Sequence, residues 1–516
     1  MKLIFVLFDS LNRGSLECYG GTALKTPNFV RLAERGVTFD KHYVGSLPCM
    51  PARRDMHTGW LSFLHRAWGP LEPFDNSFAE ILHKKGVYSH LVSDHYHYWE
   101  DGGATYHNRY DTFEFVRGQE RDPWKAMVQP PWERLKEKYH ALQFSDKRRH
   151  KFAQYIINRE FIREYKDFPS VRCFDAGVEF LDQNRTADNW LLHVETFDPH
   201  EPFHAPKEFR DAFPTAYRGP VLDWPPYARV TQAPEECEEL RANYCATVAL
   251  CDHELGRLLD YMDTHAMWDD TALVVTTDHG FLLGEHDWWA KLIMPCYNEV
   301  AHVPLFVYHP DFKSQAGTRR TSLTQTIDVA PTIHDIFGHA PPAETQGISL
   351  LKLMERDEPV RTAAIYGVFG SAVNVTDGRY TYFKYPKDLL KHDLYQYTLM
   401  PSHMKELFSV EELKDASLVP PFPFSKGVPL LKVPSTPKSP VYFGHGAGAQ
   451  QDTDTVLFDL HSDPAQLHPI TDAAVEDRLS RSMVEIMEST SAPPELYGRL
   501  DLGRYRHTHV PGETIK

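Results

Sequence analysis

The sequence predicts an α/β protein built on one large mixed, mostly parallel β-sheet with helices packed on both of its faces. Three apolar runs, at residues 3–8, 190–194 and 271–277, carry this prediction. Each run is about one strand long and lacks the alternation of a half-exposed strand, which is typical of parallel strands buried on both faces. Two of the runs continue directly into Asp9 and Asp278. Because open α/β sheets bind ligands at the carboxyl ends of their strands, both residues are expected at a functional site.

The chain is long enough for a large domain with a smaller unit appended to it, since 516 residues exceed a single typical domain. We predict a large domain at residues 1–360 and a smaller one at residues 361–516. The smaller domain is expected to rest on a short antiparallel sheet, because residues 373–384 have the pattern of a hairpin that turns at Asp377-Gly378. Insertions are expected near residues 119–168, 207–240 and 388–440.

Further elements follow from residue periodicity and from turn residues. A buried strand is expected at residues 87–92, and the proline-rich stretch 420–440 is expected to form a surface loop. Helical spacing predicts helices at residues 52–58, 77–85, 132–143, 147–165, 171–181, 245–262 and 475–487.

Composition excludes several classes of protein. The formal net charge of −16 argues against nucleic acid or an anionic membrane as a main partner, because both bind basic surfaces. The seven cysteines, an odd number at scattered positions, do not form the framework of a disulfide-rich protein. Residues 1–8 lack the length and cleavage site of a signal peptide, and no stretch approaches the roughly 20 apolar residues of a membrane helix. We therefore expect a cytoplasmic protein.

One short stretch combines a cysteine, a proline and an arginine at fixed spacing: Cys49-x-Pro51-x-Arg53, closed by Thr58-Gly59. Proline suits the first turn of a helix, and Gly59 suits its end. Cys49 is then expected at a helix N-terminus, where free N–H groups favour an anionic ligand and a reactive side chain. The alternative is a buried cysteine beside an ordinary helix cap.

A second constellation has the donor types of a metal site. Asp278 and His279 follow the predicted strand 271–277, and a turn at Gly280 lets both side chains converge on one ion. Carboxylate and imidazole are ordinary ligands of a divalent metal. Asp9 is a candidate third ligand, with a helix N-cap as the alternative reading.

Histidines follow two of the predicted strands. The segment 199–206 alternates prolines with histidines, which indicates a rigid loop that presents His200 to a site, with a structural histidine as the alternative. Asp94, His95 and His97 follow the strand 87–92, and a solvated aromatic loop is the alternative there.

The motif at Cys49 resembles the signature of the formylglycine-dependent sulfatases of the alkaline phosphatase superfamily. The order of motifs after residue 278 is similar to the second signature of that family. It comprises Asp278-His279-Gly280, Gly284-Glu285-His286, Lys291, Glu299 and Val303-Pro304-Leu305. The segment 199–206 also resembles a recurring sulfatase segment, and residues 456–464 are similar to the family's C-terminal strand and turn. The resemblance implies an alkaline phosphatase-like fold.

The resemblance implies the hydrolysis of a sulfate ester by the hydrate of a formylglycine that is made from Cys49. It implies Cys49, Arg53, His200 and Lys291 as catalytic residues, His95 and His97 as substrate contacts, and Asp9, Cys49, Asp278 and His279 as metal ligands. One divalent ion is expected, Ca²⁺ in the first place and Mn²⁺ as the alternative. His200 is expected to protonate the leaving alcohol. The expected partners are a small-molecule or saccharide sulfate ester and, during maturation, a formylglycine-generating enzyme; a homo-oligomer is left open.

The chain departs from the common sulfatase pattern in three ways. Ser10 stands where many sulfatases have a second aspartate, His279 stands where many have asparagine, and the Gly-Lys-x-His segment is absent. The first two departures resemble choline sulfatases and phosphonate monoester hydrolases. Two alternatives therefore stay open, a phosphonate monoester or phosphodiester hydrolase with the same nucleophile, and a non-catalytic anion-binding relative in which Cys49 remains a thiol.

Overall fold

The large domain is built on an eight-stranded sheet, as the sequence predicts. A computed structural model of the protein describes residues 1–390 and 393–506, so parts of the predicted smaller domain, 391–392 and 507–516, lie outside the described residues. Strand β10 pairs antiparallel with both of its neighbours, and all other pairs in the sheet are parallel. The strand order is β11 (Arg319–Gln325), β2 (Val37–Tyr43), β10 (Leu305–Tyr308), β7 (Thr271–Thr277), β1 (Lys2–Asp9), β6 (Trp190–Pro199), β4 (Tyr88–Ser93) and β5 (Thr112–Phe115).

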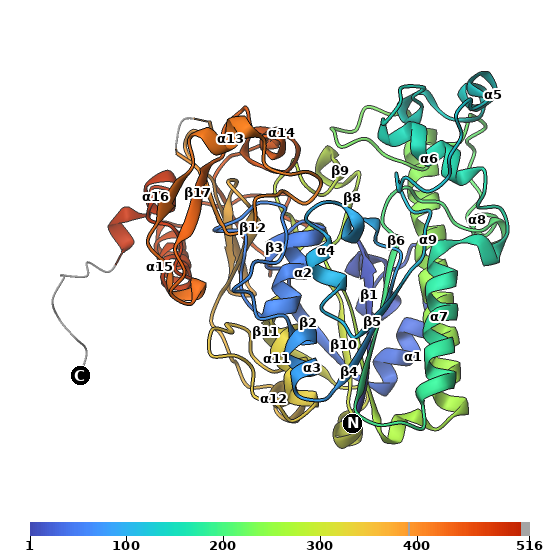
Figure 1. Ribbon diagram of the computed structural model, residues 1–516, viewed down its shortest axis with the longest axis horizontal. Helices are drawn as coiled ribbons and strands as arrows, with labels where there is room; N and C mark the ends of the chain where they lie inside the picture. The colour runs from blue at the N-terminus through green and yellow to red at the C-terminus, as the bar shows by residue number, and fades with distance from the viewer. Residues whose placement is uncertain (391–392, 507–516) are drawn as a thin grey trace.

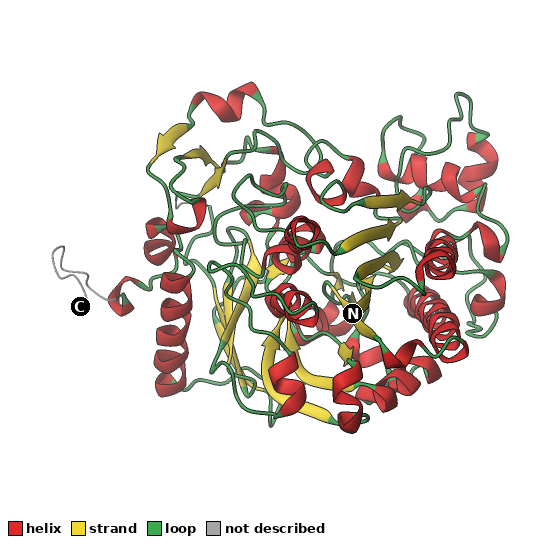
Figure 2. Ribbon diagram, turned by 60° about the horizontal axis from the view of Figure 1, so that its bottom comes forward, coloured by secondary structure: helices red, strands yellow, loops and turns green. Residues whose placement is uncertain are grey.

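Helices cover both faces of this sheet (Figures 1 and 2). Every residue of β1 is buried, because alternate side chains enter two separate apolar cores. Ile4, Val6 and Phe8 belong to one core, and Leu3, Phe5 and Leu7 belong to the other. The first core lies under α1 (Pro27–Arg35), α7 (Pro169–Asn184) and α9 (Pro234–Thr264), and the second under α2 (Cys49–Thr58), α3 (Phe78–Lys84) and α11 (Val329–Ile336).

A smaller sheet forms the C-terminal part of the molecule. Its strands, in order, are β18 (Val456–Asp459), β14 (Tyr380–Lys384), β13 (Val373–Thr376), β12 (Ala364–Val368) and β3 (Ser46–Leu47). The hairpin of β13 and β14 is where the sequence predicts it, and α15 (Ala473–Ser489) contacts β12 and β13. Strand β3 pairs in parallel with β12, so the residues just before Cys49 are fixed to the second sheet.

The insertions differ from prediction in detail. In the first insertion, α5 (Trp132–Lys138) and α6 (Lys151–Arg159) are shorter than the helices predicted at 132–143 and 147–165. The first ends because the backbone at Tyr139 turns extended and bridges Val221, and the second starts only where His150 caps it. Helix α9 begins well before residue 245, so it includes the end of the insertion predicted at 207–240.

The prediction of a surface loop at residues 420–440 is wrong. This stretch contains β17 (Leu430–Pro434), the central strand of an antiparallel sheet with β15 (Tyr395–Thr398) and β16 (Ser417–Val419). Pro434 is tolerated because it ends the strand, and Leu430 and Val433 are fully buried. Within the described residues, no helix has the length and apolar character needed to cross a membrane.

Candidate active site

Cys49 is the first residue of α2, three residues earlier than the predicted start of that helix. Its side chain is 5% exposed. Pro51 occupies the first turn, and Gly59 ends the helix with a left-handed backbone (φ 68°) and an N–H that donates to Asp55. The N–H groups of the first turn have no partner within the helix, so this end of α2 favours a negative group.

Four side chains with metal-ligating atoms meet beside this helix end. Asp9 ends β1 and Asp278 follows the neighbouring parallel strand β7, so both carboxylates reach the same edge of the sheet. One ligand atom each of Asp9, Cys49, Asp278 and His279 lies within 4.8 Å of the other three. The structure thus brings together all four residues that the resemblance assigns to a metal.

The orientation of His279 suits a metal ligand. Its Nδ1 donates to the carbonyl of Gly280 at 3.0 Å, which leaves Nε2 as an acceptor 3.2 Å from Cys49 Sγ. Burial lowers the pKa of His279 to about 4, so the ring is neutral. Two carboxylates and a neutral imidazole are donors that a divalent cation accepts, so these residues fit the expected ion.

Arg53 lies among carboxylates and not in the cavity beside Cys49. Its guanidinium donates to Glu195 at 2.5 Å, to Asp278 at 2.6 Å and to Asp9 at 3.0 Å, and it is 1% exposed. Burial opposes the charge of Asp9, but His200, Arg53 and Lys291 together hold the pKa of this carboxyl well below its usual value. Arg53, which the resemblance implies as a catalytic residue, therefore contacts the metal-ligating carboxylates that it fixes in place and does not line the cavity.

Lys291 reaches the metal-ligating residues through Ser10. Its ammonium donates to Ser10 Oγ at 2.9 Å, and Ser10 Oγ in turn donates to Asp9 Oδ1 at 2.7 Å. Although burial opposes the charge, Cys49, Glu201 and Asp9 raise the pKa of Lys291 above its usual value. The serine that replaces the second aspartate of many sulfatases thus links Lys291 to Asp9.

Cys49, Lys291 and His200 line one cavity of about 510 Å³. The cavity lies where the large domain, the first insertion and the C-terminal part meet. Trp68, Trp224 and Tyr227 give it aromatic walls, and Phe443 and Gly448 come from the C-terminal part. A cavity with a few convergent charged groups and aromatic walls is suited to a polar organic ligand. We call it the catalytic cavity.

Comparison with known proteins identifies the family. Residues 2–339 match the family model described as Sulfatase. The chain belongs to the sulfatase family. A further model, described as N-sulphoglucosamine sulphohydrolase, C-terminal, matches residues 284–418 of this sulfatase.

Curated relatives agree with this assignment. An N-acetylglucosamine-6-O-sulfatase from Bacteroides thetaiotaomicron is 25% identical over 69% of this chain and 71% of its own length. A choline-sulfatase from Rhizobium meliloti is 25% identical over 74% of this chain and 77% of its own. An arylsulfatase from Clostridium perfringens is 23% identical over 71% of this chain and 81% of its own length. The protein is a sulfuric ester hydrolase, and the family acts through a metal and a formylglycine.

Solved structures show the same fold. One, described as a complex with its substrate D-glucosamine-2-N,6-O-disulfate, superposes with a TM-score of 0.64 at 15% identity over 96% of this sulfatase and 99% of that chain. A phosphonate monoester hydrolase of Agrobacterium radiobacter gives a TM-score of 0.63 at 18% identity over 95% of each chain. The alkaline phosphatase-like fold predicted from the sequence is confirmed.

Of the two histidines predicted to contact substrate in this sulfatase, one lines the catalytic cavity and the other does not. His97 lines the catalytic cavity, where its Nδ1 lies 2.5 Å from Glu100 Oε2. His95 is fully buried, its Nε2 lies 3.5 Å from Asp9 Oδ2, and it does not line the cavity. Contrary to expectation, His95 therefore does not reach the cavity, because its ring packs against Phe197 and behind Asp9.

Two functional candidates in this sulfatase were not predicted. Glu201 is 2% exposed, with Oε2 3.2 Å from His200 Nδ1 and 3.7 Å from Lys291 Nζ. Tyr227 donates to Glu201 Oε1 at 2.6 Å. The backbone carbonyl of Glu201 also lies 2.5 Å from His200 Nδ1. The only sequence signal for Glu201 was its place beside His200 in the proline-bounded segment, and Tyr227 gave none.

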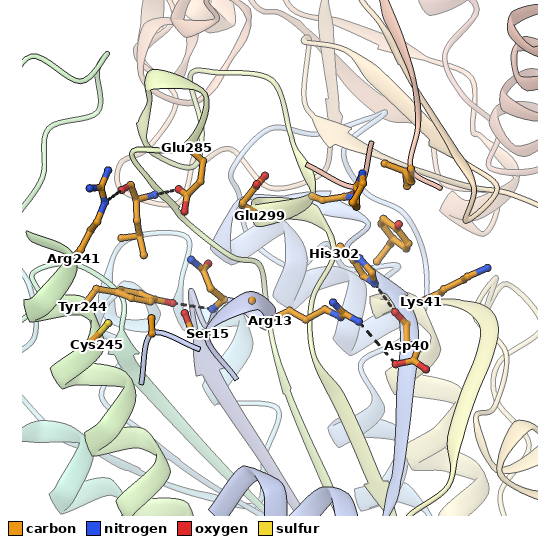
Figure 3. A pocket seen from close by; sticks show the side chains of 18 of the residues that line it. Arg13, Ser15, Asp40, Lys41, Arg241, Tyr244, Cys245, Glu285, Glu299 and His302 are labelled. Atoms are coloured by element: carbon orange, nitrogen blue, oxygen red, sulfur yellow. Dashed lines mark hydrogen bonds and ion pairs between the residues drawn. The ribbon is translucent and has the colours of Figure 1, made fainter. Parts of the chain in front are cut away.

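A second, larger cavity lies apart from this site (Figure 3). It has a volume of about 640 Å³ and contains none of the predicted catalytic or metal-ligating residues. Figure 3 shows Arg13, Asp40 and His302 on one side of it, and Tyr244 and Arg241 on the other. Size alone therefore does not locate the active site of this sulfatase.

Proposed function

We propose that this sulfatase removes a sulfate group from a saccharide, and that position 49 supplies the nucleophile as formylglycine. The observation that carries the proposal is the meeting of Cys49 with Asp9, Asp278 and His279, together with the cavity that Cys49, Lys291 and His200 line. The names of the relatives support the saccharide, since one is an N-acetylglucosamine-6-O-sulfatase and one solved structure holds a glucosamine disulfate. The aromatic walls suit a sugar ring.

The formylglycine that the maturation enzyme makes from Cys49 is an aldehyde, and addition of water to it gives a geminal diol. One hydroxyl of the diol attacks sulfur and displaces the alcohol; the other, on the same carbon, then loses its proton and expels sulfate as the aldehyde re-forms. The chain's own residues prepare this chemistry. The N-terminus of α2 and Lys291 favour the sulfate anion next to position 49. Arg53 fixes Asp9 and Asp278 and offsets their mutual repulsion. This arrangement requires a formylglycine-generating enzyme as a partner during maturation.

His200 is proposed to donate a proton to the leaving alcohol. Its Nδ1 is engaged by the carbonyl and carboxylate of Glu201, so Nε2 is the nitrogen available in the cavity. Because Glu201 accepts from Nδ1, it fixes the orientation of the ring that must transfer this proton. Tyr227 holds the carboxylate in place, so Glu201 acts as a positioning residue.

Replacing His200 with glutamine is expected to lower kcat for a saccharide sulfate by about 10²- to 10⁴-fold, the usual range for loss of a general acid. The loss for 4-nitrophenyl sulfate is expected to be much smaller, because nitrophenolate leaves without protonation. Steady-state kinetics with both substrates measure the difference. His204→Gln is the control, since His204 packs against Phe168 outside the catalytic cavity. Equal losses on both substrates contradict the acid role.

We propose Ca²⁺ as the divalent ion, held by Asp9, Asp278, His279 and the oxygen of the modified residue 49. The two carboxylates favour an ion that prefers oxygen ligands, and the imidazole of His279 makes Mn²⁺ the alternative. When bound, the ion supplies positive charge that polarises the sulfate. Ser10 contributes a hydroxyl that is already bonded to Asp9 and Lys291, so it is not proposed as a ligand.

Parallel assays of a sulfated glucosamine, 4-nitrophenyl sulfate and a phosphonate monoester test the proposed function. We expect kcat/KM for the sulfate esters to exceed that for the phosphonate by more than about tenfold. A clear preference for the phosphonate favours the alternative hydrolase instead. In the same assay, protein stripped by a chelator is expected to lose activity and to regain it with Ca²⁺; recovery with Mn²⁺ alone identifies the alternative ion.

A further inference from the structure

We propose that the catalytic cavity opens into a second, cationic subsite that binds another anionic group of the substrate, a sulfate or a carboxylate. The ammonium groups of Lys151 and Lys405 hold this group. The inference deepens the proposed function, since it rests on a saccharide sulfate as substrate and makes that substrate doubly charged.

The catalytic cavity adjoins a neighbouring one. Arg121, Lys151 and Lys405 line both the catalytic cavity of about 510 Å³ and an adjoining cavity of about 810 Å³. The adjoining cavity also contains further basic residues, Arg117 and Arg149. A substrate that extends from Cys49 toward this cavity therefore passes the three shared cations. We call this junction the cationic subsite.

Two separate insertions bring the lysines to the subsite. Lys151 is the first residue of α6, and Lys405 lies between β15 and α13 (Val410–Lys414). Figure 1 shows α6 and α13 both toward the top of the view, where the carboxyl end of β1 points, with α6 to the right and α13 to the left. Neither lysine belongs to a strand of the eight-stranded sheet, so both charges come from segments outside the central sheet.

Lys405 is a charged group without a counter-ion. Its ammonium lies 4.3 Å from the centre of the Trp68 ring, and within residues 1–390 and 393–506 it forms no hydrogen bond or ion pair. Burial and Arg121 lower the pKa of Lys405 to about 8, although Glu100 and Glu120 oppose the shift. An incompletely compensated cation in a cavity gains from an anionic ligand.

Lys151, like Lys405, has aromatic neighbours and no counter-ion among the described residues. Its ammonium lies 4.9 Å from the centre of the Phe152 ring and 5.1 Å from that of Trp224, and it too forms no ion pair with a described residue. Contacts with ring faces leave the donors of an ammonium free toward the cavity. Both lysines thus combine an aromatic neighbour with an open charge.

Two acidic residues that line these cavities, Glu100 and Glu120, already have partners. Glu100 lies 3.4 Å from Arg121 and 2.5 Å from His97 Nδ1, and Glu120 accepts from the hydroxyl of Tyr96 at 2.5 Å. Arg121 also donates to that hydroxyl at 2.8 Å. Since these groups satisfy one another, the two lysines give the subsite its surplus positive charge. An anion fits there better than a neutral or cationic group.

The second anion can belong to the sugar that carries the scissile sulfate or to the next sugar of a chain. Both sources offer the same chemistry, an oxyanion that accepts from two ammonium groups. Trp68 and Trp224, which lie beside the lysines, supply aromatic faces for a sugar ring. A doubly sulfated monosaccharide and a sulfated disaccharide with one sulfate on each sugar distinguish the two sources.

The test compares doubly and singly sulfated substrates in Lys151→Met, Lys405→Met and the double variant, since methionine removes the charge and keeps most of the stem. For the unmodified protein we expect a higher kcat/KM with the doubly sulfated substrate. We expect the ratio of the two kcat/KM values to fall by about tenfold or more in the double variant. Lys147→Met is the control, because Lys147 is an exposed lysine of the same insertion that lines neither cavity.

A ratio that stays the same in the double variant overturns the subsite, and so does an unmodified protein without preference for the second charge. Calorimetric titration of the Cys49→Ala protein with the doubly sulfated saccharide separates this inference from the proposed function. If the unmodified protein hydrolyses no sulfate ester, the proposed function fails. In that case, the affinity of Cys49→Ala for the saccharide is compared with that of Cys49→Ala carrying both lysine changes. An affinity that falls about tenfold still supports the subsite, and an unchanged affinity overturns it.

Discussion

Replacing Cys49 with alanine is expected to lower kcat/KM for a sulfate ester by about 10⁴-fold or more, because the nucleophile is lost together with an oxygen ligand of the metal. Alanine fills most of the buried space of the side chain, which is 5% exposed. The unfolding temperature of the Cys49→Ala protein should therefore stay close to that of the unmodified protein. Kinetics and thermal unfolding of the same preparation measure both quantities.

Cys245→Ala is the matched control for this change. Cys245 is a half-buried cysteine of α9 that lines the other cavity, so its loss should leave sulfatase activity intact. Retained turnover in Cys49→Ala contradicts the assignment of the nucleophile. A fall in both activity and unfolding temperature points to a structural role for Cys49 instead.

Arg53→Met is expected to have the largest effect on stability, lowering the free energy of unfolding by about 3 to 5 kcal/mol. Arg53 is the counter-ion of Asp9, Glu195 and Asp278, and all four side chains are buried. Without it, three carboxylates remain close together in the interior. Activity is expected to disappear as well, because Asp9 and Asp278 lose the group that fixes them.

The metal offers a further check on Arg53. A bound cation offsets part of the charge of Asp9 and Asp278, so the loss of stability should be smaller with saturating Ca²⁺ than with a chelator. Arg54→Met is the comparison, because Arg54 pairs with Asp75 and does not touch the metal-ligating residues. It should destabilise the protein to the same extent with and without metal, and the protein that remains folded should keep its kcat. Chemical denaturation with Ca²⁺ and with a chelator measures the free energy of unfolding of both variants. A loss of stability in Arg53→Met that is the same in both conditions contradicts the proposed role.

Local patterns in the sequence predicted the elements that carry the site. The buried runs at β1, β6 and β7 were recognisable because both faces of each strand are covered, which leaves no polar alternation. Asp9 and Asp278 could then be placed at one edge of the sheet, since adjacent parallel strands end together. The helix at Cys49 was predictable from Pro51 and Gly59.

Other parts of the site depend on contacts between distant segments. Glu195 lies within β6, and its contact with Arg53 depends on the pairing of β6 with β1. Tyr227 belongs to an insertion without regular periodicity, and its contact with Glu201 has no local signal. His95 and His97 both follow the same strand, and only contacts with distant segments, such as that of His95 with Asp9, distinguish the one that reaches the cavity.

Pairing between distant segments also explains the error at residues 420–440. Prolines at both ends of the stretch indicate a loop when it is considered alone. Strand β17 forms because β15 and β16 supply hydrogen-bonding partners on both sides, and because Leu430 packs in an apolar cluster with Trp60 and Phe424. Residues 420–429 separate β16 from β17, and residues 399–429 separate β15 from it, so the pairing has no tight-turn signal in the sequence.

Peptide mass spectrometry across residue 49 of catalytically active protein tests the central claim most directly. We expect a peptide whose mass is lower than that of the cysteine form and that reacts with a carbonyl-specific probe, which shows that Cys49 has become an aldehyde. The converted fraction should rise with specific activity when the protein is produced with increasing amounts of a formylglycine-generating enzyme. Full sulfatase activity from protein in which Cys49 is entirely a thiol would contradict the account.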